Sequence, residues 1–216
     1  MQEGIDMNMC NTNKRLITRK VSLIAGVAAL GIALILALPQ TAHAQTVTPP
    51  PVPTDIQLPA GNEAFLLGHG VGTQNYVCLP SRSIGHVDWT LFTPQATLFS
   101  DLGDQLTTHF SSPNPDEGEI VRVTWEDSRD TSTVWARATG VATVSPTAIP
   151  WVRLEVVGRA VGPTGGNTLF ETTFIQRVNT VGGVAPPTGC RLPTDIGHKA
   201  FVPYTADYFF FEKSQR

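Results

Sequence analysis

The sequence VRLEV at residues 152–156 alternates apolar with charged side chains, and TFIQRV at residues 173–178 shows the same two-residue alternation. Successive side chains of a strand point to opposite faces, so this period predicts strands with one buried face. Outside residues 1–44, no window of helical length keeps a period near 3.6 residues. These two stretches therefore predict a β-structure.

Segments of similar composition recur along the chain. They are rich in Val, Thr, Phe, Tyr and Trp and are separated by Pro, Gly, Asn and Asp, as in the hairpin-type connection GPTGGN at residues 162–167. The predicted strands are 64–78, 91–99, 105–110, 120–125, 133–144, 151–161, 169–178 and 200–211. Short strands at this spacing predict an all-β fold, a single-domain antiparallel sandwich or barrel of about eight or more strands.

The N-terminal region has the order of a secretory signal peptide. Basic residues precede an uncharged apolar run over residues 21–38, Pro39 follows, and small residues occupy both outer positions of Ala42-His43-Ala44. We therefore predict a signal peptide over residues 1–44, cleaved between Ala44 and Gln45. The alternative is an uncleaved anchor, since the run approaches the roughly 20 residues that span a bilayer. Pro39 and the A-x-A site favour cleavage, which predicts a secreted or periplasmic protein with no membrane span after cleavage.

Charge excludes one class of partner. The 216-residue chain carries 15 Lys and Arg against 18 Asp and Glu, a net charge of −3. Removing residues 1–44 takes away four basic and two acidic residues and changes the net charge to −5. A nucleic-acid-binding surface needs clustered Lys and Arg, and this acidic sequence has no basic run. We therefore expect no nucleic-acid partner.

Two cysteines remain after signal cleavage, because Cys10 lies in the removed segment. An even pair in an oxidising compartment predicts a disulfide between Cys78 and Cys190. Two separate buried thiols are the alternative. A metal pair is disfavoured, because neither cysteine has another His or Cys beside it at ligand spacing.

Five prolines between residues 49 and 59 predict an extended, polyproline-like linker over residues 45–60, followed by the β-rich domain over residues 61–216. We interpret the linker as a passive spacer. A short echo connects the two ends of the domain, since TDI and a Gly-x-x-Ala-Phe pattern occur at residues 54–65 and again at 194–201. This echo suggests that the first and last strands are neighbours and that the disulfide fastens them.

The usual catalytic signatures are missing from the sequence. It contains no G-x-S-x-G, no H-E-x-x-H and no P-loop. GHGVG at residues 68–72 resembles a nucleotide-binding loop only superficially, because a strand-like stretch follows it, and glycines that bend or bulge a strand explain it better. A metal site from His86, Asp88 and His109 is a weak alternative, since the ligand spacing is not diagnostic. We predict no cofactor and no metal.

Two further groups of side chains allow both a structural and a functional reading. The carboxylates at residues 116–119 and 126–130 could supply a glycosidase pair, but adjacent turn residues favour solvated loop acids. The four tryptophans, Trp89, Trp125, Trp135 and Trp151, could stack on sugar rings, but we expect most of them in the core.

Several segments together resemble a known family. They are GTQNYVC (72–78), AIPW (148–151), FIQRVNTVGG (174–183) and ADYFF (206–210), accompanied by His109, Pro186 and Cys190. The chain from about residue 58 to 211 is similar to the domain of unknown function 3455, a family of secreted bacterial and fungal proteins. The resemblance implies export, a Tyr-x-Cys paired with a later Cys, and a β-rich fold, but no activity. Some relatives carry a malate-dehydrogenase label, which this chain does not support because it lacks the dinucleotide fingerprint. Relatives have G-P-x-W after the histidine where this chain has Ser111-Ser112-Pro113.

Two functions fit these observations. The first is a non-enzymatic binding or envelope-associated module with an unknown ligand from the cell envelope, for example a glycan. The second is a hydrolase or metal-dependent enzyme of unrecognised type. For the second, the candidate catalytic residues are His109, Arg177 and Asp207, which are polar groups within strand-like segments. A structural ion pair between the arginine and the aspartate is the alternative.

Overall fold

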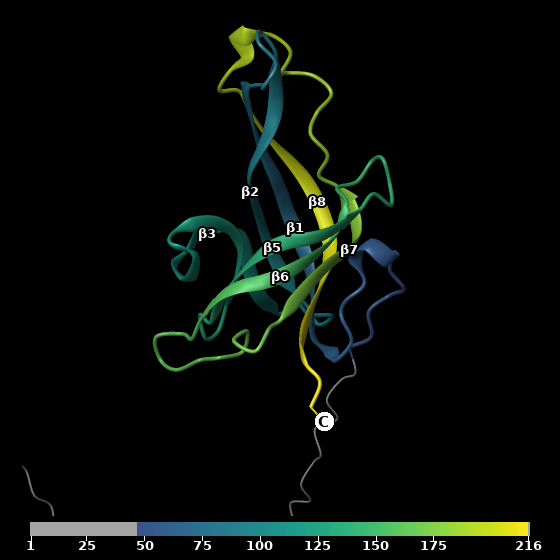
Figure 1. Ribbon diagram of the computed structural model, residues 1–216, viewed down its shortest axis with the longest axis vertical. Coiled ribbons are helices and arrows are strands. Elements are labelled where there is room, and N and C mark those ends of the chain that lie inside the picture. The colour runs from purple at the N-terminus through teal and green to yellow at the C-terminus, as the bar shows by residue number, and fades with distance from the viewer. Residues whose placement is uncertain (1–46, 216) are drawn as a thin grey trace, which may run out of the picture. The chain divides into compact units, whose positions relative to one another are not determined.

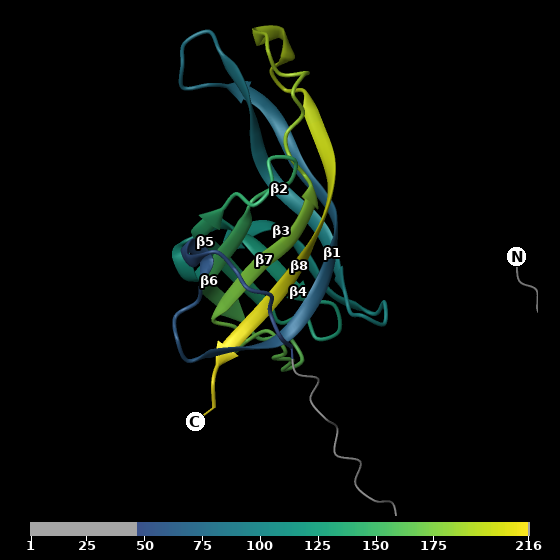
Figure 2. The ribbon, with the colours of Figure 1, turned by 90° about the vertical axis from the view of Figure 1, so that its right-hand side faces the viewer.

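Eight antiparallel strands form one closed barrel in the computed structural model, which describes residues 47–215. The predicted signal peptide (1–44) and its cleavage site at Ala44 and Gln45 lie outside these residues. The strands are β1 (Asn62–Pro80), β2 (Val87–Phe99), β3 (Gln105–Asn114), β4 (Ile120–Asp127), β5 (Thr133–Ala142), β6 (Trp151–Ala160), β7 (Phe174–Gly182) and β8 (Lys199–Lys213). Three single-turn 3₁₀ helices accompany them: η1 (Thr54–Ile56), η2 (Pro115–Glu117) and η3 (Pro193–Asp195). The all-β prediction is confirmed, and of its two architectures the barrel is the one adopted (Figures 1 and 2).

Each strand pairs with its neighbours in the chain, and β8 returns to pair with β1. This closing seam is long, running from Asn62 opposite Lys213 to Val77 opposite Lys199. The disulfide Cys78–Cys190 joins the end of β1 to the connection that leads into β8, with 5.4 Å between the two Cα atoms. The predicted neighbourhood of the first and last strands, and their disulfide, are both confirmed.

Glycines at alternate positions of β1 let the barrel wall approach large side chains. A Cβ added to Gly70 would lie 2.7 Å from Cε2 of Tyr208, and one added to Gly68 would lie 2.9 Å from the Leu98 side chain. The register irregularities of β1 fall at Ala64–Leu66 and Asn75–Tyr76, outside this run. Gly68 and Gly70 of the GHGVG stretch therefore provide space for facing side chains in a regular strand rather than bulges.

The main core fills part of the barrel interior. Its buried side chains include Leu98, Val134, Val156, Ile175 and Phe210, which come from strands on all sides of the barrel. Trp125 and Tyr208 belong to the same core and are fully buried. They make an edge-on aromatic contact with each other, with ring centroids 5.8 Å apart.

The segment before β1 packs on the outside of the barrel. Ile56 of η1 is completely buried, in a cluster with Ala142, Val178, Phe209 and Phe211. Its carbonyl oxygen accepts a hydrogen bond from Nε2 of Gln176 at 2.7 Å. The described part of the predicted linker therefore does not act as a passive spacer, because one apolar side chain and one backbone carbonyl attach it to the domain.

The strands β1, β2 and β8 extend beyond the others as an arm, visible at the top of Figures 1 and 2. Trp89 packs against the disulfide there, and its Nε1 donates to the carbonyl of Thr188 at 3.2 Å. Within residues 47–215, no helix is long and apolar enough to cross a membrane.

Candidate functional site

A cavity of about 410 Å³ lies inside the barrel, and several side chains of the main core line it. All eight strands contribute to its lining, which shows that it lies in the interior. Most of the lining is apolar, from Leu91, Pro94, Val121, Val123, Val152 and Leu154. Polar groups of Gln74, His109, Trp125, Arg177 and Tyr208 line the same space. A mainly apolar cavity with a few convergent polar groups is the usual form of a small-molecule site.

A larger hollow of about 680 Å³ lies over β1, β2 and β3 and shares Pro94 and His109 with the interior cavity. The rest of its lining consists largely of threonines and small residues such as Gly72. None of the unpartnered donors described below lines it, so the interior cavity is the better candidate site.

His109 lies within this interior and is neutral. Its ring stacks on Trp125 with centroids 4.1 Å apart, and Nδ1 lies 2.9 Å from the carbonyl oxygen of Thr124. Burial, assisted by the positive charge of Arg177, lowers the pKa of His109 to about 3. A carbonyl oxygen can only accept, so Nδ1 carries the proton and Nε2 is an acceptor. His109 therefore presents a neutral ring.

Arg177 is half-buried on β7 and lines the cavity. One of its Nη2–H groups donates to the carbonyl of Pro150 at 2.9 Å. Arg177 is in none of the salt bridges within residues 47–215. The predicted alternative of a structural ion pair with Asp207 is wrong, and the charge of Arg177 has no protein counter-ion in contact.

Three buried N–H donors of cavity-lining residues have no hydrogen-bond partner in the described part of the chain. They are Nε2 of Gln74, Nε1 of Trp125 and Nε of Arg177. A buried donor without a partner costs about 1–3 kcal/mol, and most such groups in native proteins are satisfied. These atoms expose almost no surface, and the side chains of Gln74 and Arg177 also interact with the hydroxyls of Tyr204 and Tyr208, so the three residues form a polar part of the cavity wall.

Tyr208 lines the cavity and is paired with a second buried tyrosine, Tyr204. The hydroxyls of Tyr204 and Tyr208 lie 2.8 Å apart. Burial raises the pKa of both groups and outweighs the opposing effect of the Arg177 charge, so both hydroxyls stay protonated. One hydroxyl donates to the other, which leaves the pair one further hydrogen to donate.

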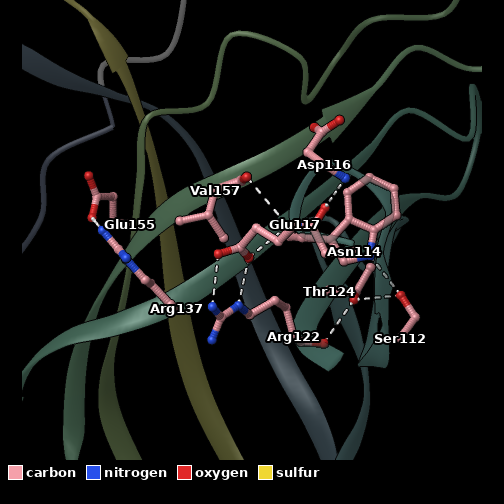
Figure 3. Close-up of polar contacts among 10 residues, drawn as sticks. Ser112, Asn114, Asp116, Glu117, Arg122, Thr124, Arg137, Glu155 and Val157 are labelled. Carbon is pink, nitrogen blue, oxygen red and sulfur yellow. Dashed lines mark hydrogen bonds and ion pairs between the residues drawn. The ribbon is translucent and has the colours of Figure 1, made fainter. Parts of the chain in front are cut away.

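The rim carries two more arginines, but these have partners, as Figure 3 shows. Arg122 binds Glu117 through Nε at 2.7 Å and Nη2 at 2.8 Å, and Arg137 binds Glu155 at 2.9 Å. Arg122 and Asn114 together lower the pKa of Glu117 to about 2. Glu117, part of the first predicted acidic cluster, is therefore a structural ion-pair partner.

The three candidate catalytic residues are only partly brought together. His109 and Arg177 line the same cavity, whereas Asp207 lies on the outer face of the barrel. Side chains alternate along β8, so an inward Tyr208 places Asp207 outward. There its Oδ1 lies 2.7 Å from Nδ1 of His69, and its Oδ2 accepts from Asn179 at 2.7 Å.

The residues of the alternative metal site do not lie together in the structure. His86 is exposed in the connection between β1 and β2, whereas His109 is buried inside the barrel. In the described part of the chain, no three His, Cys, Asp or Glu side chains gather in a metal-binding arrangement.

Gln74 and Tyr208 line the cavity but were not predicted as site residues from the sequence, and Trp125 was assigned only to the core. The sequence signal for Gln74 is that it is a polar residue within a predicted strand. The structure shows that its side chain is almost fully buried. Its inward direction depends on strand register, which alternation alone does not determine for a strand with polar residues at successive positions.

Comparison with known families matched residues 59–212, more than half of the chain, to a family described as "Protein of unknown function (DUF3455)". Comparison with curated proteins and with solved structures found no match.

Proposed function

The chain belongs to the DUF3455 family of proteins of unknown function, and we propose that it is a non-enzymatic binding protein that holds a small organic ligand inside its barrel. The observation that carries the proposal is the incompletely filled interior. An eight-stranded barrel is just wide enough either to be filled by side chains or to hold one small ligand. Here packed side chains occupy one part, and a cavity of about 410 Å³ occupies another.

Binding is favoured over catalysis by the arrangement of the polar groups. Asp207 lies outside the cavity, in contact with His69 and Asn179. His109 is held by the Thr124 carbonyl and by its stack on Trp125. The inward polar groups are thus mainly hydrogen-bond donors, which suits recognition of an acceptor.

The proposed location is outside the cytosol, in the periplasm or the surroundings of the cell. The predicted signal peptide supports this location, and so does the disulfide, since such bonds persist in oxidising compartments. The ligand would then come from the cell envelope or the medium. A glycan stacked on surface tryptophans has less support, because Trp125 and Trp135 are buried and Trp89 and Trp151 are half-buried within packed clusters.

A cavity-filling substitution tests the proposal. Ala136 is buried and lines the cavity, so Ala136→Phe would place a ring inside it. Val161→Phe adds bulk at an exposed position outside the cavity and serves as the control. We expect the protein and the control to bind a fluorescent naphthalene sulfonate probe at one site per chain, and Ala136→Phe to lose that binding while remaining folded. Equal probe binding by all three proteins would overturn the interior site.

A further inference from the structure

The cavity carries the charge of Arg177, which no carboxylate within residues 47–215 compensates, and this property limits the class of ligand that would bind. Building on the proposed function, we infer that the barrel binds a small monoanionic carboxylate with an apolar body, the carboxylate held at Arg177.

The first step concerns the sign of the charge. Arg177 is half-buried, lines the cavity and lacks a carboxylate partner within the described residues. A ligand in the cavity would displace water from this guanidinium, which is costly unless the ligand supplies a counter-charge. A neutral ligand would displace the water that solvates this guanidinium without supplying a counter-charge, so an anion is favoured.

The second step concerns the number of charges. Of the three arginines at the cavity, Arg122 is paired with Glu117 and Arg137 with Glu155. The imidazole of His109 is neutral because its burial inside the barrel disfavours the charged form. One unit of positive charge therefore remains, which matches a monoanion and leaves a dianion half-compensated.

The third step concerns the acceptor group. Arg177 lines the cavity, and within the described residues its Nη2 donates to the Pro150 carbonyl while its Nε has no hydrogen-bond partner. A carboxylate has two oxygens and about four lone-pair sites, so it accepts several N–H groups at once, and guanidinium–carboxylate pairing is frequently bidentate. A carboxylate can thus compensate the charge of Arg177 and accept two N–H groups of its guanidinium together.

The last step concerns the rest of the ligand. The remaining lining is apolar, with Leu91, Val123, Val152 and Leu154 from three strands. A cavity of about 150 Å³ holds one benzene. By that ratio, a cavity of about 410 Å³ holds on the order of 15 non-hydrogen atoms. This size corresponds to a medium-chain or aryl-substituted carboxylic acid.

The test compares ligands that differ only in charge. Aliphatic and aryl monocarboxylates of about 8–16 non-hydrogen atoms, their primary amides, and alkyl phosphates of equal chain length would be titrated calorimetrically into the purified protein. We expect one carboxylate site per chain, at least tenfold weaker binding of the matching amide, and no gain for the more highly charged phosphate. Arg177→Gln should abolish the preference for carboxylate over amide, whereas Arg129→Gln, which removes an exposed arginine outside the cavity lining, should keep it.

The outcomes separate the two proposals. Amides that bind as well as carboxylates to the unchanged protein would overturn the carboxylate inference and leave interior binding intact. Phosphates that bind more tightly would overturn the single-charge argument. Failure of every compound to bind would overturn the proposed function itself. Retention of the carboxylate preference by a folded Arg177→Gln variant would show that another group holds the anion.

Discussion

His69 and Asp207 face each other across the seam between β1 and β8, with Nδ1 of the histidine 2.7 Å from Oδ1 of the aspartate. The other ring nitrogen lies 2.7 Å from Oδ1 of Asp101, in the turn between β2 and β3. Only a doubly protonated ring can donate to both carboxylates. Asp207 therefore helps to close the barrel, and its partner is a titratable group.

The seam should weaken as the pH rises. Hydrogen bonds to Asp101 and Asp207 raise the pKa of His69 above 6.5. Its stabilisation is complete below about 6.5 and is lost as the pH rises through the raised value. Because the side chain is 40% exposed, the effect should stay below about 1 kcal/mol, or about 2–4 °C in Tm. We expect His69→Gln to melt lower than the parent protein near pH 5.5 and to match it well above neutrality. Parallel Tm–pH curves would contradict this.

His109 should govern the acid side of the stability profile. Its folded pKa of about 3 lies below the ordinary value of 6.5, so the unfolded chain binds the proton first as the pH falls. Stability should drop between those two values by up to about 1.4 kcal/mol per pH unit. Urea unfolding at pH 4–7 should show a shallower slope for His109→Gln, even though the lost stack on Trp125 lowers its stability at pH 7. His69→Gln is the control and should keep the parent's acid slope.

Breaking the disulfide should cost much of the stability. The bond joins residues separated by 112 positions, for which the chain-entropy treatment gives on the order of 4–5 kcal/mol. We expect the Cys78→Ala/Cys190→Ala double variant, and the parent protein under reducing conditions, to melt at least about 10 °C lower. An unchanged melting temperature in both would show that the seam hydrogen bonds alone determine closure.

Ile56 should behave as a core residue despite its proline-rich surroundings. Ile56→Ala removes a completely buried side chain and should destabilise the protein by about 2–5 kcal/mol in urea unfolding. The adjacent Gln57 is exposed and contributes its backbone carbonyl to Arg153, so Gln57→Ala is a matched control with little expected effect. Equal, small effects of both changes would mean that η1 is dispensable for the fold.

Gly72 should not tolerate a side chain. An added Cβ would lie 2.5 Å from Cα of Ala96, and backbone cannot move aside as a flexible side chain can. We expect Gly72→Ala to lower the free energy of unfolding by about 1–3 kcal/mol. The neighbouring Val71 is more than half exposed, so Val71→Ala should change it by less than about 0.5 kcal/mol. A similar stability for the two variants would contradict the close approach of β1 and β2.

The alternation in residues 152–156 was sufficient to predict the strand and its faces. Val152, Leu154 and Val156 are buried, while Glu155 pairs with Arg137. The choice between a barrel and a sandwich was not predictable, because the same period of two serves both. It depends on the long-range pairing of β1 with β8, which the echo and the cysteine pair only suggested.

Only some of the site residues could be predicted from the sequence, for a related reason. Polar residues within strands identified His109 and Arg177, but the direction of a side chain reverses with each residue. The side chains of Asp207 and the adjacent Tyr208 therefore point to opposite faces of the barrel wall, and only the register determines which of them points inward. Ile56 illustrates the same limit, because prolines predict extended chain but not what a single apolar residue among them contacts.

The Cys78–Cys190 bond encloses the chain from β2 to β7 within one covalent ring. A protease that cuts once anywhere between residues 79 and 189 opens the ring without releasing a fragment, since both pieces stay joined through the cystine. Non-reducing electrophoresis of a singly nicked sample would still show one band of full mass. After one cut within this ring, a second cut in the ring, or reduction, is therefore needed before any fragment of it separates from the rest.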